Sequence, residues 1–230
     1  MKPWEILDTV RTPDGGRLEL RRHDQDYVIH ADGYDLMTSR AHTSEDAMMR
    51  LACPHPPRDA RVLIGGLGMG YTLRATLDAL SEEGRIVVGE LMPEVVAWNR
   101  GPLGPLAGNP LDDPRVELVV GDVTRLIRSA ESRFDAILLD VDNGPDAFTQ
   151  RDNRWLYTRT GLAAIHRALR PNGGLAVWSV GEEATFEGRL RRAGFTPSTH
   201  RIAAHGTRGR RHVVFVGKRR TSVSRAPARS

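Results

Sequence analysis

The pattern of apolar and polar residues along the chain changes near Arg61. Before this residue, short alternating segments at residues 4–10, 17–22 and 26–37 are separated by turn residues, which predicts a small antiparallel β unit. After it, continuous apolar runs alternate with amphipathic segments. Runs without polar alternation are typical of strands buried on both faces, so this part predicts a mostly parallel sheet with helices on both sides.

The second part contains five such runs before a final pair of strands. We expect the five strands at residues 61–66, 85–91, 115–122, 134–142 and 174–180. We expect helices at residues 44–52, 71–83, 93–101, 123–130, 153–169 and 183–194. The first of these follows Thr43, and Asp46 three residues after Thr43 gives a spacing that resembles a capping box. The long helix ends before Pro171 and Gly173.

The last two strands, at residues 196–204 and 210–219, are joined by a loop that is too short for a parallel crossover, so they must be antiparallel. The sequence therefore predicts an α/β fold with a Rossmann-like seven-stranded sheet whose last strand runs against the others. We divide the chain into a small N-terminal β unit at residues 1–42, a larger Rossmann-like domain at residues 43–220, and a basic tail at residues 221–230. The tail lacks apolar periodicity and is expected to be disordered.

The net charge of +4 conceals an asymmetry along the chain. Twelve of the 33 basic residues follow Glu187 and none of the 29 acidic residues does, so residues 1–187 carry 21 basic against 29 acidic residues. The basic end could attract nucleic acid, but a solvated edge hairpin followed by a disordered tail explains it better. Nucleic acid is therefore not the expected partner.

Composition also disfavours other classes of protein. There is no unbroken apolar run of about 20 residues, so no membrane span is expected. The first residues, MKPWEILD, have no apolar core typical of a secretory signal, and cytoplasm is the expected location. The lone Cys53 excludes an internal disulfide and a multi-cysteine zinc site, and the histidines are scattered without metal-ligand spacing. No metal is expected.

A glycine-rich loop, G-G-L-G-M-G from Gly65 to Gly70, lies between the first strand of the predicted large sheet and its helix. Glycines at this position let a ligand approach the backbone at a helix N-terminus, although a purely structural tight turn would also use them. The dinucleotide fingerprint G-x-G-x-x-G does not fit, because Tyr71 occupies the last position. The spacing therefore argues against a nicotinamide cofactor.

Acidic residues follow the next two strands. Glu90 ends the second predicted strand, where a carboxylate can accept hydrogen bonds from the hydroxyls of a ribose. Gly121 and Asp122 end the third, where the carboxylate could accept from the exocyclic amine of an adenine or could cap the following helix. Together with the glycine loop, these acids predict a nucleoside-type ligand.

The fourth strand of the predicted large sheet leads into Asp140-Val141-Asp142-Asn143-Gly144-Pro145. Two carboxylates this close repel each other, so we expect one of them to have a raised pKa. They could hold a cationic amine or accept its proton, whereas an ordinary turn of this composition needs no function. Trp155 and Tyr157 could wall the same pocket by cation–π attraction, or could equally belong to the core.

With these residues in place, the chain resembles class I S-adenosylmethionine-dependent methyltransferases and, more narrowly, the spermidine synthase family over residues 26–220. The resemblance implies S-adenosylmethionine, or its decarboxylated form, as the cofactor. It implies a cofactor site made of Gly65, Gly66, Gly68, Gly70, Glu90, Leu91, Gly121, Asp122, Val123 and Asp140. Asp140 and Asp142 are the implied catalytic residues, and Asp142, Asn143, Trp155 and Tyr157 would contact a small, amine-bearing acceptor.

The chain departs from the spermidine synthase pattern at three places. Gly68 replaces the aspartate of a G-G-G-D-G-G loop, which helps to hold the amine end of decarboxylated S-adenosylmethionine. A Y-H-E-M-like stretch reads Glu45-Asp46-Ala47-Met48 here. The turn D-S-x-D-P reads D-V-D-N-G-P, so Asp142 matches the second acid only with a shift of one residue.

The missing loop acid leads to an expectation about the reaction. A carboxylate at the position of Gly68 would repel the carboxylate of intact S-adenosylmethionine by about 1 kcal/mol at 4 Å in water. Its absence favours methyl transfer as the first hypothesis. Aminopropyl transfer to a diamine is the second, supported by the two aspartates, and a non-catalytic cofactor-binding module is the third. A homodimer is expected, because the edges of the N-terminal β unit need covering.

Overall fold

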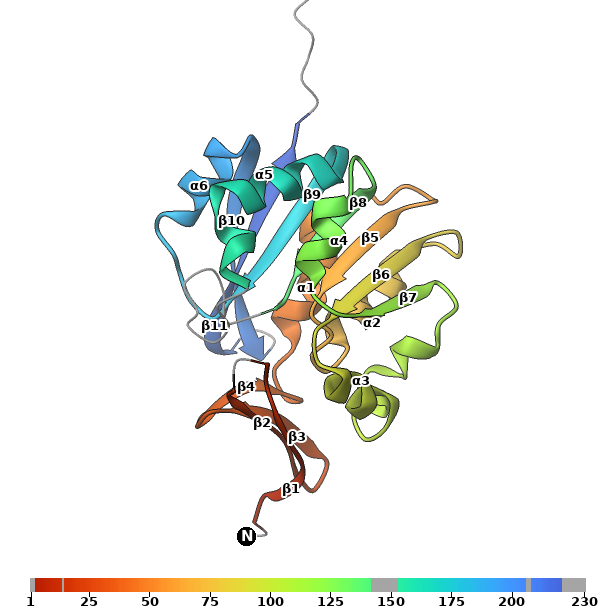
Figure 1. Cartoon of the computed structure of the whole chain (residues 1–230), viewed down its shortest axis with the longest axis vertical. Helices are drawn as coiled ribbons and strands as arrows, with labels where there is room; N and C mark the ends of the chain where they lie inside the picture. The colour runs from red at the N-terminus through yellow and green to blue at the C-terminus, as the bar shows by residue number, and fades with distance from the viewer. Residues whose placement is uncertain (1–2, 14, 142–152, 206–207, 221–230) are drawn as a thin grey trace, which may run out of the picture.

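The computed structural model describes residues 3–13, 15–141, 153–205 and 208–220, which form two sheets (Figure 1). The smaller sheet is antiparallel, in the order β1-β2-β3-β4. Its strands are β1 (Glu5–Arg11), β2 (Arg17–His23), β3 (Asp26–Ala31) and β4 (Tyr34–Thr38). The segment at residues 26–37 is thus a hairpin, whose turn residues Asp32 and Gly33 have φ values of 46° and 94°. Left-handed conformations at both positions match the right-handed twist of the flanking strands.

The larger sheet has seven strands in the order β10-β11-β9-β8-β5-β6-β7. They are β5 (Arg61–Gly65), β6 (Arg85–Glu90), β7 (Val116–Val120), β8 (Phe134–Leu139), β9 (Leu169–Ser179), β10 (Phe195–His205) and β11 (Arg208–Arg219). Five neighbouring strands are parallel, in the order β9-β8-β5-β6-β7. β11 is antiparallel to both β9 and β10. The predicted mostly parallel seven-stranded sheet is confirmed, with the last strand inserted between its neighbours.

Within the described residues, six α-helices cover the two faces of the large sheet. They are α1 (Thr43–Ala52), α2 (Tyr71–Ala79), α3 (Pro93–Arg100), α4 (Val123–Ser129), α5 (Arg159–Ala168) and α6 (Phe186–Arg192). One apolar cluster joins α1, α2 and α3 to one face and to the N-terminal sheet, and a second joins α4, α5 and α6 to the other face. Consecutive residues of β8 point to opposite faces, because Leu138 belongs to the first cluster and Leu139 to the second. None of the helices in the described ranges is long and apolar enough to cross a membrane.

Several predicted helices begin or end elsewhere in the structure. The helix predicted at residues 71–83 ends at Ala79, and the one predicted at residues 183–194 spans Phe186–Arg192. The segment at residues 153–169 is split into a 3-10 helix, Asn153–Tyr157, and α5, because the Thr158 hydroxyl caps α5 by accepting the N–H of Gly161 at 3.1 Å. β9 then begins at Leu169, directly after α5. α1 begins at Thr43 itself, so Thr43 is not its cap.

The topology creates a site for a ligand between β5 and β8. From β5 the chain proceeds outward through β6 to β7, and then returns to β8 on the other side of β5. Ligands of open α/β sheets bind beyond the carboxyl ends of the strands at such a switch point. The N-terminal sheet lies beyond this end of the large sheet (Figure 1), anchored by a hydrogen bond of 2.8 Å from Trp98 Nε1–H to the Asp8 carboxylate.

Candidate functional site

The glycine loop brings the backbones of β5 and β8 into close contact. Gly66 has a φ of 88°, and a Cβ atom placed on it would lie 2.2 Å from the carbonyl oxygen of Asp140. Gly70 has a φ of 84° and starts α2 in the left-handed conformation. A side chain is strained at both positions and is sterically blocked at Gly66, so the loop requires glycine for the fold itself.

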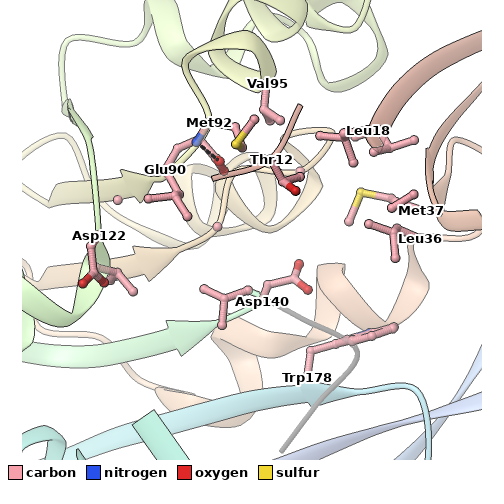
Figure 2. A pocket seen from close by; sticks show the side chains of 18 of the residues that line it. Thr12, Leu18, Leu36, Met37, Glu90, Met92, Val95, Asp122, Asp140 and Trp178 are labelled. Carbon is pink, nitrogen blue, oxygen red and sulfur yellow. Dashed lines mark hydrogen bonds between the residues drawn. The ribbon is translucent and has the colours of Figure 1, made fainter. Parts of the chain in front are cut away.

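A cavity opens between this loop and the N-terminal sheet (Figure 2). Its lining includes most of the predicted cofactor residues: Gly66, Gly68, Glu90, Leu91, Gly121, Asp122, Val123 and Asp140. Gly65 and Gly70 are not part of the lining. Gly65 packs against side chains of β8 and α4, and Gly70 faces Asn99 and Pro110, so both support the loop from behind.

Glu90 is 7% exposed, at the end of β6. Its carboxylate accepts the backbone N–H of Leu67 and that of Met92, each at 2.8 Å. Burial raises the pKa of Glu90, and these backbone donors oppose the rise. A carboxylate has about four acceptor sites. Glu90 uses two of them to tie the glycine loop to β6, so it can still accept hydrogen bonds from a ligand's hydroxyls.

Asp122 caps α4 and lines the cavity at the same time. Its carboxylate accepts the backbone N–H of Thr124 at 2.7 Å and also the hydroxyl of the same residue. The two alternatives for this residue, a helix cap and a ligand for an adenine, are therefore compatible. The cap is present in the structure, and the side chain borders the cavity from the β7 side.

Asp140 and Glu45 form a pair of acids in the cavity. Asp140 follows β8 and accepts the Thr72 hydroxyl at 3.1 Å, and Glu45 lies in the first turn of α1 with 3% exposure. Burial raises the pKa of Asp140 to about 6, against the Thr72 hydrogen bond. Burial, followed by the charge of Asp140, raises the pKa of Glu45 to about 7. Groups with pKa values near neutrality can exchange a proton with a substrate.

Met37 of β4 lies over the glycine loop. Its sulfur accepts the backbone N–H of Met69 at 3.2 Å, and a Cβ atom on Gly68 would lie 2.8 Å from its methyl carbon. The place where the family carries an aspartate is thus covered by a thioether. The N-terminal sheet supplies Met37 and also Leu18 and Leu36, which line the same cavity (Figure 2).

The four residues predicted to contact the acceptor have different outcomes. Asp142 and Asn143 lie outside the described residues. Trp155 and Tyr157 pack in the second apolar cluster, where Tyr157 is 3% exposed and meets Phe186 edge-on. The guanidinium of Arg128 lies 4.1 Å from the centre of the Trp155 ring. The structure therefore gives both aromatic residues packing contacts on the α4–α6 face, away from the cavity lining.

The structure adds Glu45, Thr72 and Met37 to the site, and Trp178, which ends the fifth predicted strand and could have been either pocket wall or core, lines the cavity. A sequence signal exists for Glu45, because it stands three, four and seven residues before Met48, Met49 and Ala52, which form the buried stripe of α1. An acid in an apolar stripe indicates a buried charge. Thr72 and Met37 have no comparable signal, since their roles depend on how distant elements meet.

The charged side chains of the lining all have one sign. Five acids contribute, namely Asp32, Glu45, Glu90, Asp122 and Asp140, and no Lys, Arg or His is among the described lining residues. The described chain contains no cluster of three or more His, Cys, Asp or Glu side chains suited to a metal ion. A cavity of this kind attracts cationic ligands and disfavours a free carboxylate.

The sheet order, the glycine loop and the acids after β6 and β7 define a fold of the S-adenosylmethionine-dependent methyltransferase type. Within it, residues 42–187 match the spermine/spermidine synthase domain family. This match covers more than half of the chain, and the chain belongs to that family of transferases.

Relatives of known sequence agree with this assignment. The chain is 38% identical over 125 residues to polyamine aminopropyltransferase 2 of Pseudomonas aeruginosa, covering 53% of this chain and 33% of the relative. It is 31% identical over 151 residues to polyamine aminopropyltransferase 1 of Hyperthermus butylicus, covering 64% of this chain and 50% of the relative. It is 37% identical over 120 residues to putrescine N-methyltransferase 2 of Nicotiana attenuata, covering 51% of this chain and 30% of the relative. The chain thus spans half or less of the length of these relatives.

The fold is also that of spermidine synthase crystal structures. The enzyme from Thermotoga maritima matches with a TM-score of 0.73 and 20% identity, and a spermidine synthase in complex with the transition state analogue AdoDATO matches with 0.72 and 19%. Each match covers 93% of this chain and 72% of the other. At this identity the likeness establishes the fold alone.

The expectation of methyl transfer as the main activity is wrong. The family is that of spermine and spermidine synthases, and polyamine aminopropyltransferases are among the relatives. The expectation depended on the missing acid at Gly68 alone, and the acidity of the cavity has other sources. Glu45 places a carboxyl in the same cavity from α1, so the lining remains acidic without the loop aspartate. Its described residues offer no cation to the carboxylate of intact S-adenosylmethionine.

Proposed function

We propose that this chain is a polyamine aminopropyltransferase, which transfers the aminopropyl group of decarboxylated S-adenosylmethionine to an amine acceptor. The observation that carries the proposal is the acidic cavity, whose described lining has five carboxyl groups and no basic side chain. Decarboxylated S-adenosylmethionine carries a sulfonium and an ammonium and no carboxylate, and an amine acceptor is also a cation at neutral pH. Both fit a cavity of this charge.

Each lining group has a proposed role. Glu90 would accept the ribose hydroxyls, and Asp122 with Val123 would hold the adenine. The backbone at Gly66 and Gly68 would border the aminopropyl chain of the cosubstrate. The carbon of this chain that is bonded to the sulfonium is the electrophile. Support comes from their shared location in one cavity at the topological switch point.

Asp140 is the proposed acceptor of the proton that the amine loses before it attacks. A general base works best when its pKa lies near the working pH, and the pKa of Asp140 is raised to about 6. Glu45 holds a second carboxyl beside it, so that a protonated amine meets negative charge from both β8 and α1. Positioning of the two cations in one cavity would supply much of the rate enhancement. Asp142 remains a proposed second contact for the amine.

Product analysis tests the proposal. The protein is incubated with decarboxylated S-adenosylmethionine and putrescine, and the products are separated by chromatography and identified by mass spectrometry. We expect spermidine and 5′-methylthioadenosine in equal amounts, and at least about 100-fold less of both with Asp140→Asn. Absence of any polyamine product across a panel of linear diamines and triamines contradicts the proposal.

A further inference from the structure

The hydroxyl of Ser44 connects the cavity to β11, in the antiparallel part of the large sheet. Ser44 lies in the first turn of α1 and is fully buried. Its oxygen hydrogen-bonds the Glu45 carboxylate, accepts the indole N–H of Trp178 at 3.0 Å, and lies 3.0 Å from Nδ1 of His212 on β11. The imidazole of His212 also packs edge-on against Trp178, with ring centres 4.8 Å apart.

The valence of the hydroxyl limits how these bonds can be arranged. A serine hydroxyl has one hydrogen to donate and two lone pairs. The indole of Trp178 can only donate, so it always takes one lone pair. The remaining hydrogen and lone pair must serve Glu45 and His212, one each. If Glu45 is ionised, Ser44 donates to it and His212 donates from Nδ1. If Glu45 is protonated, it donates to Ser44, and Ser44 donates to Nδ1 of His212.

We propose that Glu45, Ser44 and His212 form a proton relay, which carries the proton released by the amine acceptor from the cavity to the partly exposed imidazole of His212. This inference rests on the proposed function for the identity of the proton's source. Exchange between the two arrangements moves one proton from Glu45 to Ser44 and one from Ser44 to Nδ1, while no heavy atom needs to move. Trp178 holds the hydroxyl in place in both arrangements.

The balance of the transfer reaction requires such an outlet. The acceptor enters as an ammonium and loses one proton to Asp140 or Glu45. Its nitrogen lone pair then forms the new N–C bond, the C–S bond breaks, and sulfur keeps the electron pair and becomes a neutral thioether. The product nitrogen is again an ammonium, so each turnover leaves one net proton in a buried cavity, and the acid that took it must lose it before the next cycle.

The surroundings of Glu45 are suited to passing a proton on. Asp140 faces it from β8, His42 lies on its own helix, Tyr71 is on α2, and His212 is reached through Ser44. Burial and the Asp140 charge raise the pKa of Glu45 to about 7, while His42 and Ser44 oppose the rise. Tyr71 keeps its proton, because burial raises its pKa to about 12. Among the described groups around Glu45, the Ser44–His212 branch leads from it by consecutive hydrogen bonds to β11.

Steady-state kinetics with decarboxylated S-adenosylmethionine and putrescine test the relay in the active protein. We expect Ser44→Ala and His212→Asn to lower kcat by about 10- to 100-fold with KM for putrescine nearly unchanged, and Ser44→Thr, which keeps the hydroxyl, to recover most of kcat. Thr76→Val is the matched control, since it removes another buried hydroxyl, which donates to the Thr72 carbonyl at 2.7 Å. Wild-type kcat in Ser44→Ala, or an equal loss in Thr76→Val, overturns the relay.

A second measurement does not depend on turnover. In protein with ¹⁵N-labelled histidine, the ring nitrogens of His212 are assigned by their loss in His212→Asn and followed from pH 5 to 9. The relay predicts an inflection from Glu45 in the His212 shifts, which disappears in both Glu45→Gln and Ser44→Ala. An inflection that persists in Ser44→Ala reflects simple proximity of charge and overturns the relay. If no diamine is turned over, the proposed function fails while this titration still decides the relay.

Discussion

Gly66 and Asp140 approach so closely that no side chain fits between them, since a Cβ atom on Gly66 would lie 2.2 Å from the carbonyl oxygen of Asp140. Gly66→Ala should therefore disturb the cavity wall and the fold together. Overpacking of this kind costs about 1–3 kcal/mol, in addition to the strain of a left-handed alanine. We expect a lower free energy of unfolding in urea and weaker binding of 5′-methylthioadenosine by calorimetry.

Gly108→Ala provides the matched control for Gly66→Ala. Gly108 has a φ of 66°, and a Cβ atom placed on it meets nothing within 4 Å. This variant therefore carries the left-handed strain without the clash. Equal loss of stability in the two variants would contradict the close approach of Gly66 to Asp140.

Asp140→Asn should strongly reduce turnover while the protein stays folded. Asparagine keeps the size of the side chain and can still accept the Thr72 hydroxyl, but it cannot take a proton from the amine. General base catalysis is worth about 10²–10⁴-fold in rate, and we expect kcat to fall within this range. In the wild type, kcat should rise with pH through the region of about 6 to 7, where Asp140 and Glu45 lose their protons. A kcat that is independent of pH from 5 to 8 contradicts this assignment.

Glu45→Gln should change how stability depends on pH. The pKa of Glu45 is raised from 4.5 to about 7 in the folded state, so the folded protein binds a proton that the unfolded chain has already lost. Stability from this group is complete below the unfolded pKa and is lost as pH rises through about 7. Each pKa unit corresponds to about 1.4 kcal/mol, so we expect the wild type to lose more than about 1 kcal/mol between pH 5 and 8.

Urea unfolding at several pH values measures the effect of Glu45→Gln. The variant should show a smaller loss of stability between pH 5 and 8, and should be the more stable protein at pH 8. Glu117→Gln, which alters an exposed acid on β7, controls for the loss of a carboxyl group as such. Parallel pH profiles for the wild type and Glu45→Gln would show that the Glu45 pKa is not raised by folding.

Asp122 combines two roles that substitutions can separate. Asp122→Ala removes both the cap of α4 and the proposed adenine contact, and loss of a cap costs about 1 kcal/mol. Asp122→Ser keeps a capping hydroxyl but has a shorter side chain. We expect Asp122→Ser to have nearly normal stability and a several-fold higher KM for decarboxylated S-adenosylmethionine. A KM equal to that of the wild type would leave Asp122 with the cap alone.

The large sheet could be read from the sequence because its evidence is local. Buried parallel strands appear as continuous apolar runs, and the short final connection requires an antiparallel pair, so the seven strands follow from patterns of 5 to 12 residues. The sequence does not reveal that the predicted helix at residues 153–169 is interrupted at Thr158, because the apolar spacing continues across this residue. The start of α5 is marked by the hydrogen bond from the Gly161 N–H to the Thr158 hydroxyl.

The cavity was predictable in part for a related reason. Glu90, Asp122 and Asp140 each end or follow a strand of one sheet, so their proximity follows from the topology. Glu45 and Met37 reach the cavity from α1 and β4, and their contribution depends on how the N-terminal sheet and α1 pack on the large sheet. The glycine at position 68 therefore predicts a less acidic cavity than the folded chain has, since Glu45 adds a carboxyl group from α1.

The central claim is that an acidic cavity selects decarboxylated S-adenosylmethionine for aminopropyl transfer. The most direct measurement supplies both cosubstrates at equal concentration with putrescine and determines the products by mass spectrometry. The account predicts spermidine and 5′-methylthioadenosine, with little or no S-adenosylhomocysteine. N-methylputrescine and S-adenosylhomocysteine as the main products would contradict it.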